Sequence, residues 1–109
     1  MGLNKGMERM GAWMAAGPAK LAGLSGRKGH LAAGADADFV VFDPDVAWTV
    51  APEHIHFRHK LSPYLGAELR GRVLGAWLRG RQICSATTSG HSFIGSPRGK
   101  ELTRKPVLP

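Results

Sequence analysis

The sequence contains a single cysteine, Cys84, and one thiol cannot close a disulfide within the chain. Nothing therefore indicates a secreted, disulfide-stapled domain. Apolar runs are short, and none approaches the ~20 residues that a membrane helix needs. The first residues lack the apolar core of a signal peptide, and Gly6 stands where a myristoylation motif needs Ser or Thr. These absences predict an intracellular, cytoplasmic protein with no targeting signal and no membrane partner.

Acidic residues are scarce: 8 Asp and Glu stand against 15 Lys and Arg, which gives a net charge of +7. Such a surplus permits attraction to nucleic acid, although it says nothing about the fold. A basic β-ribbon can contact phosphates, but no aromatic residues interleave here as platforms for single strands would require. We therefore interpret the basic residues as a solvated strand face and expect no nucleic-acid partner; they are Arg70, Arg72, Arg79, Arg81 and Lys60.

The N-terminal third reads as helix followed by a glycine-rich connection. An apolar stripe at helical spacing predicts a helix over residues 3–16, and it consists of Leu3, Met7, Met10 and Met14. We expect this helix to end at Gly17, because Pro18 disfavours helical geometry just before itself. A second, short helix over Pro18 to Ala22 is then closed by Gly23. Residues 25–37 form a basic, glycine-rich connection.

Short strands follow. The apolar run of residues 38–43 predicts a buried strand, and Asp43-Pro44-Asp45 predicts a turn before a second strand at residues 48–50. Residues 51–67 look irregular, with one helical turn at Pro52-Glu53-His54.

The later part of the chain contains the clearest β-hairpin, which covers residues 69–84. Its turn lies at Arg79-Gly80, since glycine supplies the positive φ that tight hairpin turns need. From Ser85 onward the composition is polar, and we expect an extended or disordered tail over residues 85–109.

Three histidines form the most obvious candidate site, in the pattern HxHxxH at His54, His56 and His59. Imidazole nitrogens bind zinc, and histidines two apart on a strand can face one ion. The segment is irregular, however, and only Glu53 offers a carboxylate nearby. We therefore favour surface or packing roles and predict no metal ligand here.

Cys84 could in principle pair with a histidine as a nucleophile, but nothing in the sequence supplies an orienting group. A thiol at the end of a strand is the simpler interpretation. The chain has no GxSxG, P-loop or GxGxxG motif. We accordingly predict no catalytic, cofactor-binding or metal-binding residue in this chain.

Several stretches together resemble the carboxyl-terminal part of the amidohydrolase superfamily. They are Met14-Ala15-Ala16-Gly17-Pro18-Ala19-Lys20-Leu21-Ala22-Gly23-Leu24, Arg27-Lys28-Gly29 and Gly34-Ala35-Asp36-Ala37-Asp38-Phe39-Val40-Val41-Phe42-Asp43. The resemblance covers roughly residues 7–84. It implies an α+β fold in which the last helix or two of a (β/α)8 barrel precede the C-terminal half of a small β-sandwich. The implied divisions are barrel helices at 1–24, partial sandwich at 25–84 and tail at 85–109.

A later stretch looks most like allantoinases among the cyclic amidohydrolases, with dihydroorotases and dihydropyrimidinases (hydantoinases) as near relatives. It runs Arg58-His59-Lys60-Leu61-Ser62-Pro63-Tyr64-Leu65-Gly66, followed by Leu69-Arg70-Gly71-Arg72-Val73 and Leu78-Arg79-Gly80-Arg81. The resemblance implies hydrolysis of a cyclic amide C–N bond, in which allantoin opens to allantoate during purine catabolism.

The resemblance also implies two metal ions, commonly zinc, that activate a water. Family enzymes bind them through an HxH pair after the first barrel strand, a carboxylated lysine, two further histidines and an aspartate after the eighth strand. None of these falls on this sequence, since His54-Ile55-His56 follows the sandwich strands. We therefore expect this chain to be inactive alone. Remaining alternatives are a non-catalytic interaction module and a dihydropyrimidinase- or dihydroorotase-type enzyme. Expected partners are the sandwich strands from the family's N-terminal region or a second copy, because family members are commonly homo-oligomers.

Overall fold

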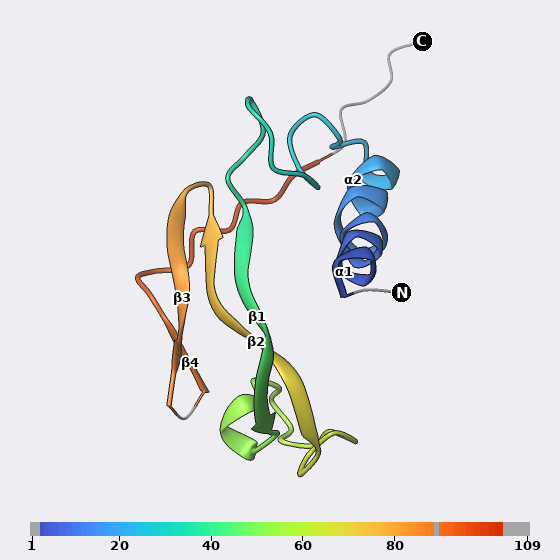
Figure 1. The fold of residues 1–109 in the computed structure, drawn as a ribbon. Coiled ribbons are helices and arrows are strands. Elements are labelled where there is room, and N and C mark those ends of the chain that lie inside the picture. The colour runs from blue at the N-terminus through green and yellow to red at the C-terminus, as the bar shows by residue number, and fades with distance from the viewer. Residues whose placement is uncertain (1–2, 89, 104–109) are drawn as a thin grey trace. The chain divides into compact units, whose positions relative to one another are not determined.

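The computed structural model describes residues 3–88 and 90–103 and divides the chain into two compact units. One contains the described residues up to Asp38 together with those from Pro97 onward, and the other is Phe39–Ser96. The first is helical and the second holds a four-stranded antiparallel sheet (Figure 1). The α+β class predicted from the sequence is therefore confirmed.

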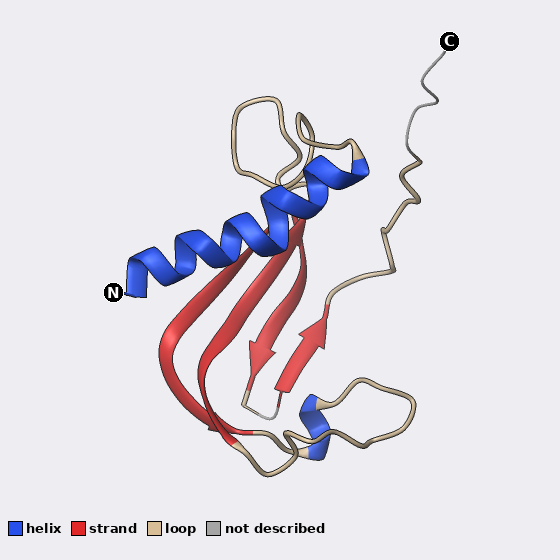
Figure 2. Cartoon of the chain, turned by 90° about the vertical axis from the view of Figure 1, so that its right-hand side faces the viewer, coloured by secondary structure: helices blue, strands red, loops and turns tan. Residues whose placement is uncertain are grey.

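The helices form one uninterrupted run: α1 (Leu3–Gly11), the π-helical turn η1 (Ala12–Ala16) and α2 (Gly17–Ala22) (Figure 2). The predicted break at Gly17 is wrong. Gly17 has helical angles, and its N–H donates to the carbonyl of Ala12, five residues back. Pro18 lacks an N–H and its ring would clash with the carbonyl four residues back, so the wider π turn accommodates it without ending the helix. Closure at Gly23 is confirmed, with φ of 78° and its N–H bonded to carbonyls of α2.

The connection after α2 packs back onto the helix at Gly29. Its φ is +92°, and an added Cβ would lie 2.6 Å from the Cβ of Ala19 and 2.9 Å from the carbonyl oxygen of Ala15. Ala19 is buried. Only glycine combines this backbone conformation with such a close approach.

Strand β1 (Phe39–Thr49) corrects two sequence predictions at once. We expected a turn at Asp43-Pro44-Asp45 between two strands, but the strand continues through it with a register shift between Asp43 and Ala47. The Asp45 N–H donates to Asp43 Oδ1 at 2.9 Å. β1 lies at an edge of the described sheet, and a proline without an N–H is tolerated at an edge or a bulge.

The remaining strands are β2 (Glu68–Leu78), β3 (Arg81–Thr87) and β4 (Gly90–Phe93), in the sheet order β1-β2-β3-β4. The predicted hairpin is confirmed, and its turn residues Arg79 and Gly80 have φ of 47° and 80°. The single helical turn is confirmed as the 3-10 helix η2 (Pro52–His54).

The structure differs from the sequence prediction in residues 85–93, where we expected the start of a tail. β3 extends to Thr87, and β4 pairs with it from Gly90 to Phe93. The polar composition of this segment gave no signal of a strand. β4 forms nevertheless, because its pairing with β3 uses backbone groups and does not require an apolar pattern.

Little apolar surface is buried within the described residues. The buried hydrophobic residues are Ala19, Val50 and Ile55. Large side chains such as Leu21, Leu61 and Met14 are 83%, 79% and 74% exposed. Sheets and amphipathic helices normally bury one face, so these elements present surfaces suited to further packing. No helix in the described ranges is long and apolar enough to cross a membrane.

Candidate functional site

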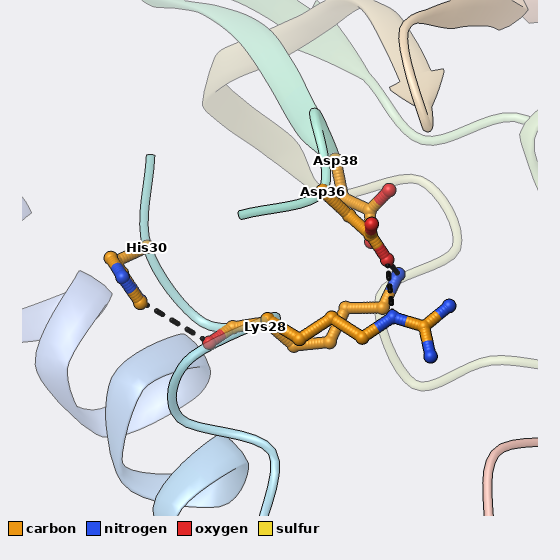
Figure 3. Close-up of polar contacts among 5 residues, drawn as sticks. Lys28, His30, Asp36 and Asp38 are labelled. Carbon is orange, nitrogen blue, oxygen red and sulfur yellow. Dashed lines mark hydrogen bonds and ion pairs between the residues drawn. The ribbon is translucent and has the colours of Figure 1, made fainter. Parts of the chain in front are cut away.

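A cluster of four charged side chains fixes the connection between α2 and β1 (Figure 3). Lys28 Nζ lies 2.8 Å from Asp36 Oδ2 and also bonds to Asp38, and Arg27 Nε lies 2.9 Å from the same Asp36 oxygen. We call Arg27, Lys28, Asp36 and Asp38 the charged cluster. It brings together residues nine and ten positions apart on either side of a glycine-rich turn.

The charges of the cluster reinforce one another. Hydrogen bonds to Asp36, and then to Asp38, raise the pKa of the Lys28 ammonium above its ordinary value. The hydrogen bond from Lys28, and then that from Arg27, lowers the pKa of the Asp36 carboxyl. Both groups are therefore charged throughout the neutral range, which suits a structural clasp and does not suit proton transfer.

Backbone hydrogen bonds support the same loop. The Asp36 N–H donates to the carbonyl of Arg27 at 2.9 Å, and the Lys28 N–H donates to that of Leu24 at 2.8 Å. His30 Nδ1 lies 3.3 Å from the Lys28 carbonyl oxygen (Figure 3). Sequence reasoning identified the basic and the acidic stretches separately but missed their pairing. The available signal was two cations placed before two carboxylates across Gly34, whose φ of +89° reverses the chain.

The histidines of the HxHxxH pattern do not converge on one point. His54 Nδ1 accepts the N–H of Ala51 at 2.9 Å, and its ring packs edge-on against Trp48. His56 packs edge-on against a different ring, Phe93. Within residues 3–88 and 90–103, no group of three side chains of metal-ligand type is placed to bind an ion. These histidines therefore do not fit the zinc site that the family implies, and their observed contacts are packing contacts and a backbone hydrogen bond.

Cys84 and the basic hairpin residues have structural contacts. Cys84 is a free, half-buried thiol, and its carbonyl accepts a hydrogen bond from Gln82 Nε2 at 3.3 Å. Arg72 Nη2 donates to the carbonyls of Gly90, at 2.8 Å, and Thr87. Arg72 thus holds the start of β4 against β2. The expectation that the hairpin binds no nucleic acid stays a prediction.

A pocket of about 170 Å³ lies on the sheet unit beside β1, β2, β4 and η2. We call it the Trp48 pocket. Its wall is formed by Phe42, Trp48, His54, Gly71, Arg72, Val73 and His91. The ring of Phe42 lies over Gly71, where an added Cβ would come within 2.5 Å of it. Sequence reasoning did not anticipate the pocket, because its residues come from segments far apart in the chain.

Comparison with known proteins gives relatives over most of the chain. Allantoinase from Streptomyces avermitilis is 38% identical over 100 residues, which are 92% of this chain and 21% of the relative. D-phenylhydantoinase from Escherichia coli is 36% identical over 104 residues, 94% of this chain and 22% of the relative. The chain thus spans about a fifth of the length of the curated relatives it matches.

Solved structures agree with these relatives. L-hydantoinase (dihydropyrimidinase) from Arthrobacter aurescens matches with a TM-score of 0.71 and 32% identity, over 85% of this chain and 21% of that one. D-hydantoinase (dihydropyrimidinase) from a Thermus species matches with a TM-score of 0.62 and 34% identity, over 75% of this chain and 17% of that one. The sequence profile described as "Amidohydrolase family" matches residues 7–84. The resemblance inferred from the sequence is confirmed: the chain belongs to the amidohydrolase family, and its relatives fall among the cyclic amidohydrolases.

Proposed function

We propose that this chain is part of a cyclic amidohydrolase that opens the ring of allantoin to allantoate in purine catabolism, in the cytoplasm. The observation that carries the proposal is the 38% identity to the Streptomyces avermitilis allantoinase across 92% of the chain. A hydantoinase or dihydropyrimidinase function is the alternative within the same chemistry, supported by 36% identity to D-phenylhydantoinase. Either enzyme hydrolyses a cyclic amide C–N bond.

The proposed role of the chain is structural. Residues 1–24 would supply the last helices of the barrel, and residues 25–84 would supply half of the sandwich, which the end of β3 and β4 (Gly90–Phe93) extend before the tail. The exposure of Met14 and Leu21 on the helix supports this role, as does that of Val40 on the sheet. We propose that strands from the family's N-terminal region, within a commonly homo-oligomeric enzyme, complete the sandwich.

In this proposal, the zinc site lies in the part of the enzyme that this chain does not span. When bound, zinc would act as a Lewis acid and activate a water. The residues of this chain would stabilise local structure. The charged cluster holds the connection that leads into β1, and Gly29 allows that connection to pack closely against α2. The chain alone is accordingly proposed to be inactive.

Two assays test the proposal. The isolated chain, supplied with zinc, is expected to show no allantoin hydrolysis above the buffer rate, and turnover above that rate would refute the proposed inactivity. A chimera tests the structural role: the matched segment of the Streptomyces avermitilis allantoinase is replaced by this chain. We expect the chimera to hydrolyse allantoin and the same enzyme with the segment deleted to be inactive. A folded but inactive chimera would count against the proposal.

A non-catalytic interaction module derived from an amidohydrolase is the second candidate. The observation that favours it is the large exposed apolar surface, for example Leu61 and Trp13, at 79% and 70% exposure. Such a module would bind a full-length relative. Co-purification of this chain with one would support the module, whereas a monodisperse monomer that ignores the relative would argue against it.

A further inference from the structure

The Trp48 pocket has the size of a single side chain. Its volume of about 170 Å³ is close to the ~150 Å³ of an engineered apolar cavity that takes up one benzene molecule. Phe42, Trp48 and Val73 supply much of its apolar wall. The pocket therefore suits one aromatic ring or one branched aliphatic group.

Polar groups of the wall on the β1 side are already paired with the backbone. The indole N–H of Trp48 donates to the carbonyl of Gly71 at 2.7 Å. His54 Nδ1 accepts the N–H of Ala51 at 2.9 Å. These bonds hold both rings in place and leave them to contribute mainly apolar contact.

The wall on the β4 side is arranged in the same way. Arg72 Nη2 donates to the carbonyls of Thr87 and Gly90. His91 Nε2 lies 2.8 Å from the carbonyl oxygen of Val73, and therefore donates to it. An occupant of the pocket consequently has few hydrogen bonds to satisfy, and apolar surface is the property that the pocket selects.

The surroundings of the pocket indicate an occupant that belongs to a polypeptide. Exposed apolar side chains continue along the same face of these two strands: Val40 lies two residues from Phe42 and is 57% exposed, and Leu69 lies two residues from Gly71 and is 36% exposed. A free ring-sized molecule would fill the pocket and leave that surface in water. The relatives are more than four times as long as this chain, so the family supplies ample further polypeptide to cover it.

We propose that the Trp48 pocket receives one aromatic or branched aliphatic side chain from a part of the amidohydrolase chain that this chain does not span. This inference rests on the proposed structural role, and it specifies where the remaining polypeptide would contact the sheet. An anchor of this kind at the centre of a covered surface is where association is most sensitive to substitution.

The first test probes the pocket itself with benzene. The isolated chain carries labelled methyl groups, and the Val73 methyl resonances are followed by NMR as benzene is added. We expect them to shift, and we expect Val73→Phe, which fills the pocket with its own ring, to abolish binding. Leu74→Phe is the matched control, because Leu74 is the adjacent residue of β2 and does not line the pocket. Unmoved Val73 methyls in the unchanged chain, or equal loss of binding in the control, would overturn the proposal.

A smaller substitution distinguishes loss of benzene binding from misfolding of the chain. Val73→Ile adds one methylene and is expected to weaken benzene binding by about tenfold while leaving the circular dichroism of the chain unchanged. Binding as tight as that of the unchanged chain would show that Val73 does not border the occupied space.

The second test identifies the occupant. The portion of the Streptomyces avermitilis allantoinase outside its matched segment is co-expressed with this chain, and the affinity of the complex is measured. Val73→Phe is expected to weaken the complex about tenfold. A complex that Val73→Phe leaves equally tight would overturn this inference alone. The absence of any complex with the unchanged chain would overturn the occupant and the proposed function together.

Discussion

Lys28 and Asp36 form the centre of the connection that precedes the sheet: the ammonium nitrogen lies 2.8 Å from the carboxylate oxygen, with the two side chains 18% and 23% exposed. Arg27 binds the same oxygen and Asp38 binds the same ammonium. The pairing converts a glycine-rich segment into a loop of defined geometry.

Removing the ammonium should loosen this loop. Lys28→Met leaves Asp36 and Asp38 without their shared partner. We expect the Asp36 amide, which donates to the Arg27 carbonyl, to exchange with solvent about tenfold faster, because local opening becomes easier. Hydrogen exchange measured by NMR checks this. Lys20→Met on α2 is the matched control, and equal acceleration in that variant would show a general loss of stability.

Stability should also depend on pH through the cluster, at both ends of the range. The pKa of Asp36 is lowered from its ordinary 3.8, so its contribution is present above that pH and is lost as the pH falls through the folded-state pKa. The pKa of Lys28 is raised from its ordinary 10.5, so its contribution is present below that pH and is lost as the pH rises through the folded-state pKa.

The measurement is the difference in unfolding free energy between the unchanged chain and Lys28→Met as a function of pH. We expect a plateau across the neutral range that declines below about pH 4 and above about pH 10. A difference that stays constant into strong acid and strong alkali would contradict the role given to these charges.

Gly29 should be among the least replaceable residues of the helical unit. Gly29→Ala places a Cβ 2.6 Å from that of Ala19 and forces a side chain onto a φ of +92°. We expect destabilisation of about 2 kcal/mol, measured by urea unfolding with helical circular dichroism. Gly26→Ala is the matched control, because an added Cβ there meets nothing within 4 Å. A loss no larger at Gly29 than at Gly26 would show that the loop does not pack on α2.

Pro18 should be the cause of the π turn. Pro18→Ala restores an N–H that can reach the carbonyl of Met14 and removes the ring that crowds it. We expect η1 to tighten to regular α-helix, seen as altered Cα chemical shifts over Ala12–Ala16. Unchanged shifts would place the cause of the wide turn elsewhere, for example at Gly17.

Local sequence signals predicted the features that depend on neighbouring residues. The hairpin turn at Arg79-Gly80, the helical turn at Pro52 and the helix end at Gly23 all follow from backbone preferences of glycine and proline. The family was predicted from the residue pattern of 34–43, and the family profile, which matches residues 7–84, confirms it.

Other features depend on interactions that local sequence patterns do not reveal. Pro18 was expected to stop a helix, but a wider turn absorbs it. Pro44 was expected to make a turn, but an edge strand tolerates it. The strand at Gly90–Phe93 pairs with the backbone of β3 and is bonded to β2 through Arg72 and His91, and the Trp48 pocket is formed by β1, β2, β4 and η2 together.

The central claim is that this chain contributes structure, and no catalytic group, to a cyclic amidohydrolase. The most direct measurement is allantoin hydrolysis by the isolated chain with zinc and by the chimera with the Streptomyces avermitilis allantoinase. The claim predicts no turnover by the chain alone and turnover by the chimera. Hydrolysis by the chain alone, or a folded chimera without activity, would contradict it.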